Sequence, residues 1–351
     1  MVINIADDVL KEGKTNPQIL TALKYLFYFF ESGYHSWWLT LNDDEELYNI
    51  NELSSFREFI IKQIKKESLK GGGLEPPNYY VKILPNKNSI EQTKSEIERQ
   101  YPNAQLLLLV DGHRLRIEEN GRVCEIISID ILESFVGDKL KVVLEDIRSD
   151  KLFIMKSLEL LEQIQEEDLS KLRLEFINGG GSNIKNQIEH YQCKHRVICI
   201  IDSDHVAPGL YLNDKERRKK EKLIRLCNSL GVPLKILSKR EIENYLPDQA
   251  LIAQGVNENH PFFIFNDTQK DYFDMKNGLK KNDLDLSIWQ DNAGLDSDEV
   301  AASSSEENLI LNGFGESIWQ AFQYVNSKEE LESRDQNNEI QAILKEILHM
   351  V

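Results

Sequence analysis

Short apolar runs alternate with amphipathic stretches along the middle of the chain, between about residues 140 and 250. The runs are rich in β-branched residues and lie at 141–144, 172–177, 196–201 and 232–237. Nearly continuous apolar runs of this length are typical of parallel strands that are buried on both faces. Helical periodicity follows the first three runs, with the last of these helices expected at 214–230. This alternation predicts an α/β fold of the Rossmann-like kind, a mostly parallel sheet with flanking helices.

The preceding stretch predicts an α+β N-terminal region. Residues 1–70 carry apolar residues at helical spacing, most clearly at 17–30 and after Ser54. After a glycine-rich break at 71–77, four strands are predicted, at 79–84, 105–110, 114–118 and 123–129. Ser89 is expected to open a short helix with a capping box. Asn120-Gly121 predicts a hairpin turn between the last two strands.

These patterns predict four parts of the chain. They are a helical N-terminal region (1–70), a small α/β region (71–138), an α/β domain (139–250) and a mostly helical C-terminal region (251–351). In the last part, the small and acidic residues of 291–306 predict a mobile segment.

Acidic residues stand at the ends of two of the predicted strands. Asp202 and Asp204 follow the third apolar run, and Glu145 follows the first. The carboxyl ends of parallel strands lie at one edge of a sheet, where open α/β folds bind their ligands. Crowded carboxylates repel one another unless a cation lies between them, and hard oxygen ligands suit Mg²⁺ or Mn²⁺. The sequence therefore predicts a site for one or two of these ions.

A plainer interpretation competes with the metal site. An acid that follows a strand often only caps the next helix, and for Asp202 alone we would prefer that explanation. The combination of Asp202 and Asp204 with Glu145 reverses the preference. Lys239 and Arg240 could have a role at the metal site. Ion pairs with Glu241 and Glu243 explain these two basic residues equally well.

The order of these pieces resembles a known family. A strand that ends in Glu, a glycine-rich turn and a strand that ends in Asp-x-Asp resemble the topoisomerase–primase (toprim) domain. In detail, the chain resembles the overcoming-lysogenization-defect (OLD) nucleases and related defence-associated toprim nucleases. The resemblance covers about residues 140–250, and it rests on the segments 142–153, 176–183, 202–204 and 238–246.

The resemblance implies roles for the acids. It makes Glu145, Asp202 and Asp204 ligands of the catalytic Mg²⁺ or Mn²⁺. Asp150 is a further candidate ligand, although its spacing departs by one residue from the family's second acid after the first strand. Asp146 replaces a glycine that commonly follows the Glu, either as an added ligand or as a residue that tightens the turn.

The resemblance also implies supporting residues. Lys239 is expected to contact the phosphate or the transition state, because a nearby lysine offsets charge that develops on phosphoryl oxygens. Glu243 and Ser203 are expected to support the metal site.

Two segments are candidates for binding phosphates of the substrate. One is the turn before a predicted helix, whose free N–H groups would favour an anion; it consists of Gly179, Gly180, Gly181 and Ser182. A tight turn with no binding role explains the same glycines equally well. The other is the basic stretch 215–222, in which Arg217 and Arg218 would follow a nucleic-acid backbone. Because two glutamates interrupt this stretch, a solvent-exposed helix face also explains it.

Charge and composition restrict the function further. The formal net charge of −17 over 351 residues argues against a protein that coats nucleic acid in general. Residues 141–250 contain 19 Lys and Arg against 18 Asp and Glu, so the region around the acids is close to neutral. The four cysteines form no Cys-x-x-Cys pair, and no signal peptide or apolar run of membrane-spanning length is present. We therefore expect a cytoplasmic protein that does not bind membranes.

The leading hypothesis is a metal-dependent nuclease that acts on DNA or RNA, with tRNA among the candidates, as the toxic effector of a bacterial antiphage system. OLD proteins carry a fused ATPase, whereas Gly13-Lys-Thr15 lacks the earlier glycine of a phosphate-binding loop. We therefore expect a separate ABC-type ATPase as a partner, and a homodimer is compatible with the sequence. The alternatives are a non-catalytic toprim module that binds nucleic acid or a partner, and an enzyme of the topoisomerase or primase type.

Overall fold

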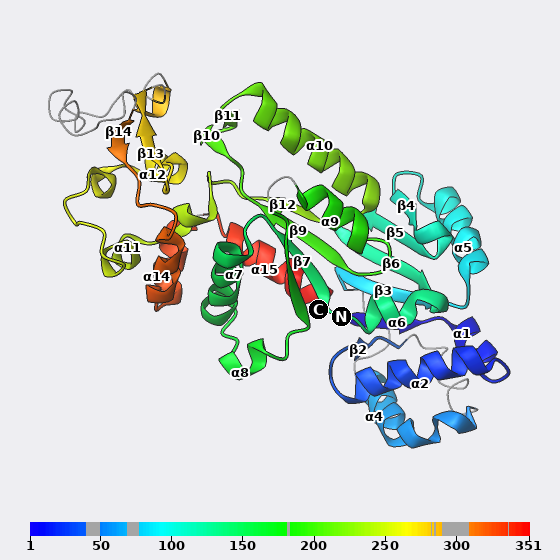
Figure 1. Cartoon of the computed structure of the whole chain (residues 1–351). Coiled ribbons are helices and arrows are strands. Elements are labelled where there is room, and N and C mark those ends of the chain that lie inside the picture. The colour runs from blue at the N-terminus through cyan, green and yellow to red at the C-terminus, as the bar shows by residue number, and fades with distance from the viewer. Residues whose placement is uncertain are drawn as a thin grey trace.

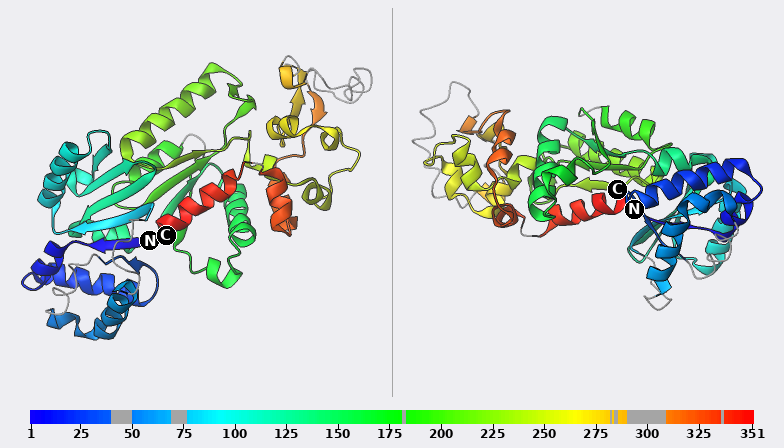
Figure 2. Two further views of the ribbon diagram at one scale, coloured as in Figure 1. Left: turned by 180° about the vertical axis from the view of Figure 1, so that it is seen from behind. Right: turned by 90° about the horizontal axis from the view of Figure 1, so that it is seen from below.

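The computed structural model describes residues 1–39, 50–68, 77–180, 183–281, 283, 286–289, 309–335 and 337–351. Within these residues the strands form a six-stranded sheet, a four-stranded sheet and two pairs of short strands. The molecule is a mixed α/β protein whose sheets are mostly parallel and are flanked by helices (Figure 1). Figure 2 shows the parts in a row, with the four-stranded sheet between the N-terminal sheet and the C-terminal elements.

The four-stranded sheet carries the residues that the sequence singles out. Its strands are β7 (Leu140–Leu144), β8 (Leu174–Asn178), β9 (Val197–Ile201) and β12 (Leu234–Ile236). They are parallel throughout and lie in the order β12-β9-β7-β8. β7 and β9 are buried at every position, which explains their continuous apolar sequence. The predicted strands and their parallel pairing are confirmed.

Helices cover both faces of this sheet. They are α7 (Ile147–Leu161), α8 (Glu166–Leu169), α9 (Ile184–Tyr191), α10 (Asp214–Leu230) and, from the end of the chain, α15 (Glu339–Met350). On one face α7 and α15 share an apolar core with Val142 and Leu144 of β7. On the other face α9 and α10 pack against Val143. The chain leaves β7 for β8 on one side and returns to β9 on the other, so a topological switch point lies between β7 and β9.

The six-stranded sheet lies in the N-terminal part. Its strands are β1 (Val2–Ile5), β2 (Ser36–Trp37), β3 (Tyr79–Leu84), β4 (Gln105–Leu109), β5 (Arg114–Glu119) and β6 (Arg122–Ser128). The order is β2-β1-β3-β6-β5-β4, and only the pairs that include β5 are antiparallel. The predicted hairpin turn is confirmed, with Asn120 and Gly121 both at positive φ.

Two predictions for this part need correction. Residues 1–70 are not only helical, because β1 and β2 accompany the helices α1 (Asp7–Gly13), α2 (Pro17–Glu31) and α4 (Arg57–Ser68). A strand as short as β1 offers too few positions for an alternating pattern to stand out. The helix α5 (Lys87–Gln100) begins before Ser89, because the side chain of Asn86 caps it by accepting a hydrogen bond from the Ser89 N–H.

The C-terminal region contains helices, 3₁₀ turns and a pair of strands. Among the described residues, its helices besides α15 are α11 (Asp248–Ala253), α12 (Asp267–Tyr272) and α14 (Lys328–Arg334), and its antiparallel strands are β13 (Gly278–Lys280) and β14 (Leu309–Asn312). The strand pair adds to the mostly helical content that the sequence predicts. The predicted mobile segment 291–306 and most of the glycine-rich break, 71–76, lie outside the described residues. Among the residues that the structure describes, no helix is long and apolar enough to cross a membrane.

Candidate metal and phosphate site

The acids predicted to bind a metal lie at the switch point of the four-stranded sheet. Glu145 directly follows β7 and Asp202 directly follows β9, and these strands are neighbours. Asp204 lies two residues further on, before the short hairpin of β10 (His205–Ala207) and β11 (Leu210–Tyr211). Parallel pairing therefore brings acids from two distant parts of the chain to one edge of the sheet.

The carboxylates of Glu145 and Asp204 and the backbone carbonyl of Asp202 meet around the side chain of Lys220, which comes from α10. The Lys220 Nζ lies 2.8 Å from Oδ2 of Asp204 and 3.6 Å from Oε2 of Glu145. It also donates a hydrogen bond of 2.6 Å to the backbone carbonyl of Asp202. Burial disfavours the ammonium, but the charges of Glu145 and Asp204 outweigh this effect and raise the pKa of Lys220. A buried ammonium thus neutralises part of the acidic site.

The sequence analysis did not single out Lys220, although a signal was present. Lys220, Leu223 and Cys227 form the buried face of α10. The spacing of three and four residues places a lysine on the apolar face of an otherwise solvent-exposed helix. A lysine at such a position needs a partner, because lysines are almost never fully buried without one.

A second group of acids lies close to Asp202. Oδ1 of Asp202 accepts a hydrogen bond from the N–H of Ile242 at 2.9 Å. Burial raises the pKa of Asp202 far above its usual range, and the charges of Asp150 and Glu145 add to this effect. Burial also raises the pKa of Asp150 and the pKa of Glu241 to about 7. So many acids with raised pKa values at one sheet edge are typical of a functional site.

Lys276 is the counter-ion of this second group. Its Nζ lies 2.9 Å from Oε2 of Glu241 and 3.2 Å from Oε1 of Glu243. Glu243 is fully buried, and burial raises its pKa. The pairing of these glutamates with Lys239 and Arg240, considered from the sequence, is therefore not the one the structure adopts. Arg240 pairs instead with Asp274, at 2.7 Å.

Asp146 and Asp150 shape the start of α7. The side chain of Asp146 caps this helix by accepting a hydrogen bond from the Arg148 N–H. The Asp150 carboxylate accepts hydrogen bonds from the Asp146 N–H at 3.0 Å and from the Ser149 hydroxyl at 2.7 Å. The sequence leaves Asp146 as either an added metal ligand or a residue that tightens the turn. These contacts support the role in the turn. Asp150 combines a local role with a position close to the other acids.

Ser203 ties the loop of the two aspartates to the segment after β12. Its hydroxyl donates a hydrogen bond of 2.6 Å to the carbonyl of Lys239. The N–H of Asp204 donates to the carbonyl of Arg240 at 3.0 Å, and Asp204 adopts a φ of 58°. Aspartate tolerates this left-handed conformation better than most residues. Ser203 thus supports the site by fixing the position of its neighbours.

The contacts of Lys239 differ from those expected from the sequence. Its Nζ lies 2.6 Å from Oδ1 of Asp271 and 4.8 Å from the centre of the Tyr245 ring. Burial and the nearby charge of Arg334 lower the pKa of Lys239 to about 8. Among the described contacts, the lysine that meets Glu145 and the Asp-x-Asp pair is Lys220 rather than Lys239.

The N–H groups of the glycine turn are already used within the fold. Gly179 donates to the carbonyl of Leu144 at 2.7 Å, and Gly180 donates to the carbonyl of Glu145 at 3.1 Å. A Cβ atom on Gly179 would lie 2.6 Å from the Leu144 carbonyl oxygen, so only glycine fits there. These two N–H groups are therefore not free for a phosphate, in contrast to the expectation from the sequence. Gly181 and Ser182 lie outside the described residues.

A cavity of about 630 Å³ opens beside Lys220, with Glu145 and Asp204 in its wall. Basic residues of α9 and α10 also line it, and we call four of them the basic rim: Lys185, Lys219, Lys222 and Arg225. Arg217 and Arg218, the arginines expected from the sequence, are not among the lining residues. Arg217 pairs with Asp214 at 3.0 Å, and Arg218 is exposed. The basic residues of α10 that line the cavity are thus not the two arginines expected from the sequence.

Comparisons with known proteins found no protein-family model, no curated protein and no solved structure that matches this chain. The function must therefore be argued from the chemistry of the site.

The donor atoms suit a hard divalent cation. Oε2 of Glu145 and Oε1 of Glu243 are buried, and each faces an ammonium, that of Lys220 at 3.6 Å and that of Lys276 at 3.2 Å. Carboxylate and carbonyl oxygens of this kind are the ligands that Mg²⁺ and Mn²⁺ prefer. Within the described residues, however, no three His, Cys, Asp or Glu side chains converge as a ready-made metal site. The ammonium of Lys220 takes up the space between Glu145 and Asp204.

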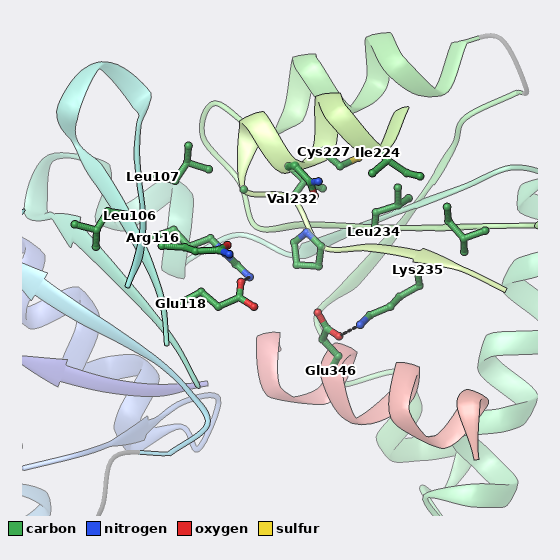
Figure 3. Close-up of a pocket in the computed structure, with 15 residues that line it drawn as sticks. Leu106, Leu107, Arg116, Glu118, Ile224, Cys227, Val232, Leu234, Lys235 and Glu346 are labelled. Atoms are coloured by element: carbon green, nitrogen blue, oxygen red, sulfur yellow. Dashed lines mark ion pairs between the residues drawn. The ribbon is translucent and has the colours of Figure 1, made fainter. Parts of the chain in front are cut away.

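A second cavity, of about 590 Å³, lies between the two large sheets (Figure 3). The strand β4, with Leu106 and Leu107, lines it on one side, and Val232 and the strand β12 line it on the other. Lys235 and Glu346, which form an ion pair, lie on the side toward α15. The acids of the metal site do not line this cavity, so the site argued below is the one beside Lys220.

Proposed function

We propose that this protein is a Mg²⁺- or Mn²⁺-dependent nuclease with a toprim fold, which hydrolyses phosphodiester bonds of DNA or RNA. One observation carries the proposal. Glu145, Asp202 and Asp204 lie together at the switch point of a parallel sheet, and Glu145 and Asp204 line a cavity with a basic rim. Phosphodiester hydrolysis requires acidic side chains that hold a cation, beside basic side chains that bind the phosphates.

Each group of residues has a task in this proposal. Glu145, Asp202 and Asp204 would hold the ion, with Asp150 and Glu243 close by for a second one. The bound ion would neutralise charge on the scissile phosphate and activate a water. The basic rim would bind the phosphates on either side. Its ion pairs within α9 and α10 are exposed and therefore weak, so a phosphate competes with them readily.

The strand arrangement supports the toprim assignment. Glu145 ends β7, the glycine turn follows β8 and the Asp-x-Asp pair follows β9, in one parallel sheet. The resemblance to OLD-like nucleases extends the proposal to a toxic effector of antiphage defence. In that role a separate ABC-type ATPase would control the nuclease.

One observation favours a second candidate function. The Lys220 ammonium already partly neutralises the acids, and no three carboxylates converge among the described residues. This arrangement is what a non-catalytic toprim module, one that binds nucleic acid or a partner without metal, would show. The two candidates differ in whether binding depends on the cation.

The test is a cleavage assay with matched variants. Purified protein is incubated with plasmid DNA, single-stranded DNA and tRNA in Mg²⁺, in Mn²⁺ and in EDTA. We expect metal-dependent cleavage that Glu145→Gln and Asp202→Asn each reduce by about 100-fold or more, whereas Glu159→Gln, on the exposed surface of α7, leaves it unchanged. Cleavage that survives both substitutions would contradict the site. Binding in EDTA without cleavage in either metal would favour the second candidate.

A further inference from the structure

Lys220 is held by oxygen atoms from each part of the proposed metal site. The oxygens are a carboxylate oxygen of Glu145, a carboxylate oxygen of Asp204 and the backbone carbonyl of Asp202, at 3.6, 2.8 and 2.6 Å from Nζ. Two carboxylates and a carbonyl are also a suitable set of ligands for a hard divalent cation. An ammonium and a metal ion cannot occupy this place together.

The surroundings of Lys220 allow its ammonium to leave. The residue is 6% exposed, yet it lines the cavity of about 630 Å³ beside the acids. Its flexible side chain carries a compact point charge with three donors that rotate freely. The members of the basic rim lie along the same cavity, where phosphates of a substrate would bind. An ammonium displaced from the acids would therefore still have a charge partner.

We propose that Lys220 is a tethered cation, which occupies the metal position in the metal-free protein and moves to a substrate phosphate when a divalent ion binds. This inference rests on the proposed function of the same site. The tethered ammonium neutralises Glu145 and Asp204 while no metal is bound, and it lowers the affinity for the metal by competing with it. Metal binding thereby delivers a positive charge to the phosphate.

The first test measures metal affinity rather than activity. Mn²⁺ binding is followed by electron paramagnetic resonance and by calorimetry for the wild type, Lys220→Met and Lys222→Met. Lys222 is exposed and lines the same cavity, so its substitution controls for the loss of one positive charge. We expect Lys220→Met to bind Mn²⁺ about tenfold more tightly than the wild type, because the competing charge is gone. Lys222→Met should change the affinity far less.

A second measurement does not depend on the folding of a variant. Wild-type protein is treated with a lysine-acetylating reagent with and without Mn²⁺, and each lysine is quantified by mass spectrometry. We expect acetylation of Lys220 to increase when Mn²⁺ binds, because its ammonium leaves the buried position, while acetylation of Lys222 stays constant. In Glu145→Gln, Mn²⁺ at the same concentration should have little effect on Lys220.

The outcomes separate this inference from the proposed function. If Mn²⁺ binds to the wild type in a manner that depends on Glu145, the proposed metal site stands. Equal affinities for the wild type and Lys220→Met, or unchanged acetylation of Lys220, would then overturn the tethered cation alone. If no Mn²⁺ binds to any of the proteins, the proposed function and this inference both fail.

Discussion

Asp150 and Glu241 are acids whose protons should be detectable at ordinary pH. Burial raises the pKa of each to about 7 in the folded chain, whereas a carboxyl group in an unfolded chain loses its proton near pH 4. Between these values the folded state binds more protons at these two groups than the unfolded state, so their contribution to stability is fully present below about pH 4 and is lost as the pH rises toward 7. We therefore expect the metal-free protein to lose about 2 kcal/mol of unfolding free energy per such group between pH 5 and 7.

The variant Asp150→Asn isolates one of these contributions. Its urea unfolding in EDTA is followed by circular dichroism at several pH values. The loss of unfolding free energy between pH 5 and 7 should be about 2 kcal/mol smaller in the variant than in the wild type, because one titrating group is gone. Burial lowers the pKa of His35 to about 3, and its opposite effect on stability is common to both proteins and cancels in the difference. Equal losses in the wild type and the variant would show that Asp150 is ionised throughout this range. Added Mg²⁺ should also reduce the loss in the wild type.

Among single residues, the acids that follow strands could be predicted from the sequence, whereas the lysines that pair with them, Lys220 and Lys276, could not. Glu145, Asp202 and Asp204 were found from the sequence because a strand end fixes where the next side chains lie. Lys220 lies 18 residues from Asp202 along the chain, and its contact with the acids depends on how α10 packs on the sheet. Lys276 belongs to a loop of the C-terminal region, for which no periodic pattern specifies a position.

The basic residues of α10 divide into those that line the cavity and those that do not, and the proposed function gives phosphate binding only to the first group. Lys219, Lys222 and Arg225 line the cavity, whereas Arg217 and Arg218 lie outside it. Each lysine or arginine that contacts a phosphate releases a counter-ion, so binding weakens with salt in proportion to the number of contacts. The dependence of nucleic-acid binding on salt concentration therefore distinguishes the two groups of residues.

We expect the triple variant Lys219→Gln, Lys222→Gln and Arg225→Gln to bind oligonucleotides more weakly and with a shallower salt dependence. The slope of log K against log salt should decrease by about one unit per lost contact. Fluorescence anisotropy at several salt concentrations, with Ca²⁺ to support binding without cleavage, measures this slope. The matched control is Arg217→Gln with Arg218→Gln, which should leave the slope nearly unchanged. A shallower slope in the control and an unchanged slope in the triple variant would instead identify Arg217 and Arg218 as the phosphate-binding residues.

For the whole molecule, the sequence predicted the kinds of element better than their arrangement. The strands and helices of 139–250 followed from apolar runs and periodicity, and their parallel pairing followed from the alternation. The order β12-β9-β7-β8 did not follow, because periodicity does not tell on which side of β7 the chain adds a strand. In the N-terminal part, β1 pairs with β3 across a long intervening segment. Such pairings depend on tertiary packing, which a local pattern does not encode.

Arg196 joins three parts of the molecule. The residue is 1% exposed and precedes β9. Its guanidinium donates to the carbonyl of Phe135 at 2.8 Å, at the end of the short helix α6 (Leu132–Val136), and to the carbonyls of Asp138 and Met350. It thereby connects α6, the chain that enters β7 and the end of α15. Burial lowers the pKa of Arg196 to about 10, so the group remains charged at neutral pH and relies on these carbonyls for its hydrogen bonds.

We expect Arg196→Met to destabilise the protein by about 3 kcal/mol or more, because buried carbonyls would lose their donor. The loss should also weaken the connection between the two large sheets, so that calorimetry resolves two unfolding transitions in the variant and one in the wild type. Arg148→Met, which removes an exposed arginine at the start of α7, should leave the stability nearly unchanged and keep one transition. A single transition of nearly wild-type stability in Arg196→Met would mean that apolar packing alone holds the sheets together. Since β9 begins at the next residue and Asp202 directly follows its end, the same variant should bind Mn²⁺ more weakly even where it remains folded.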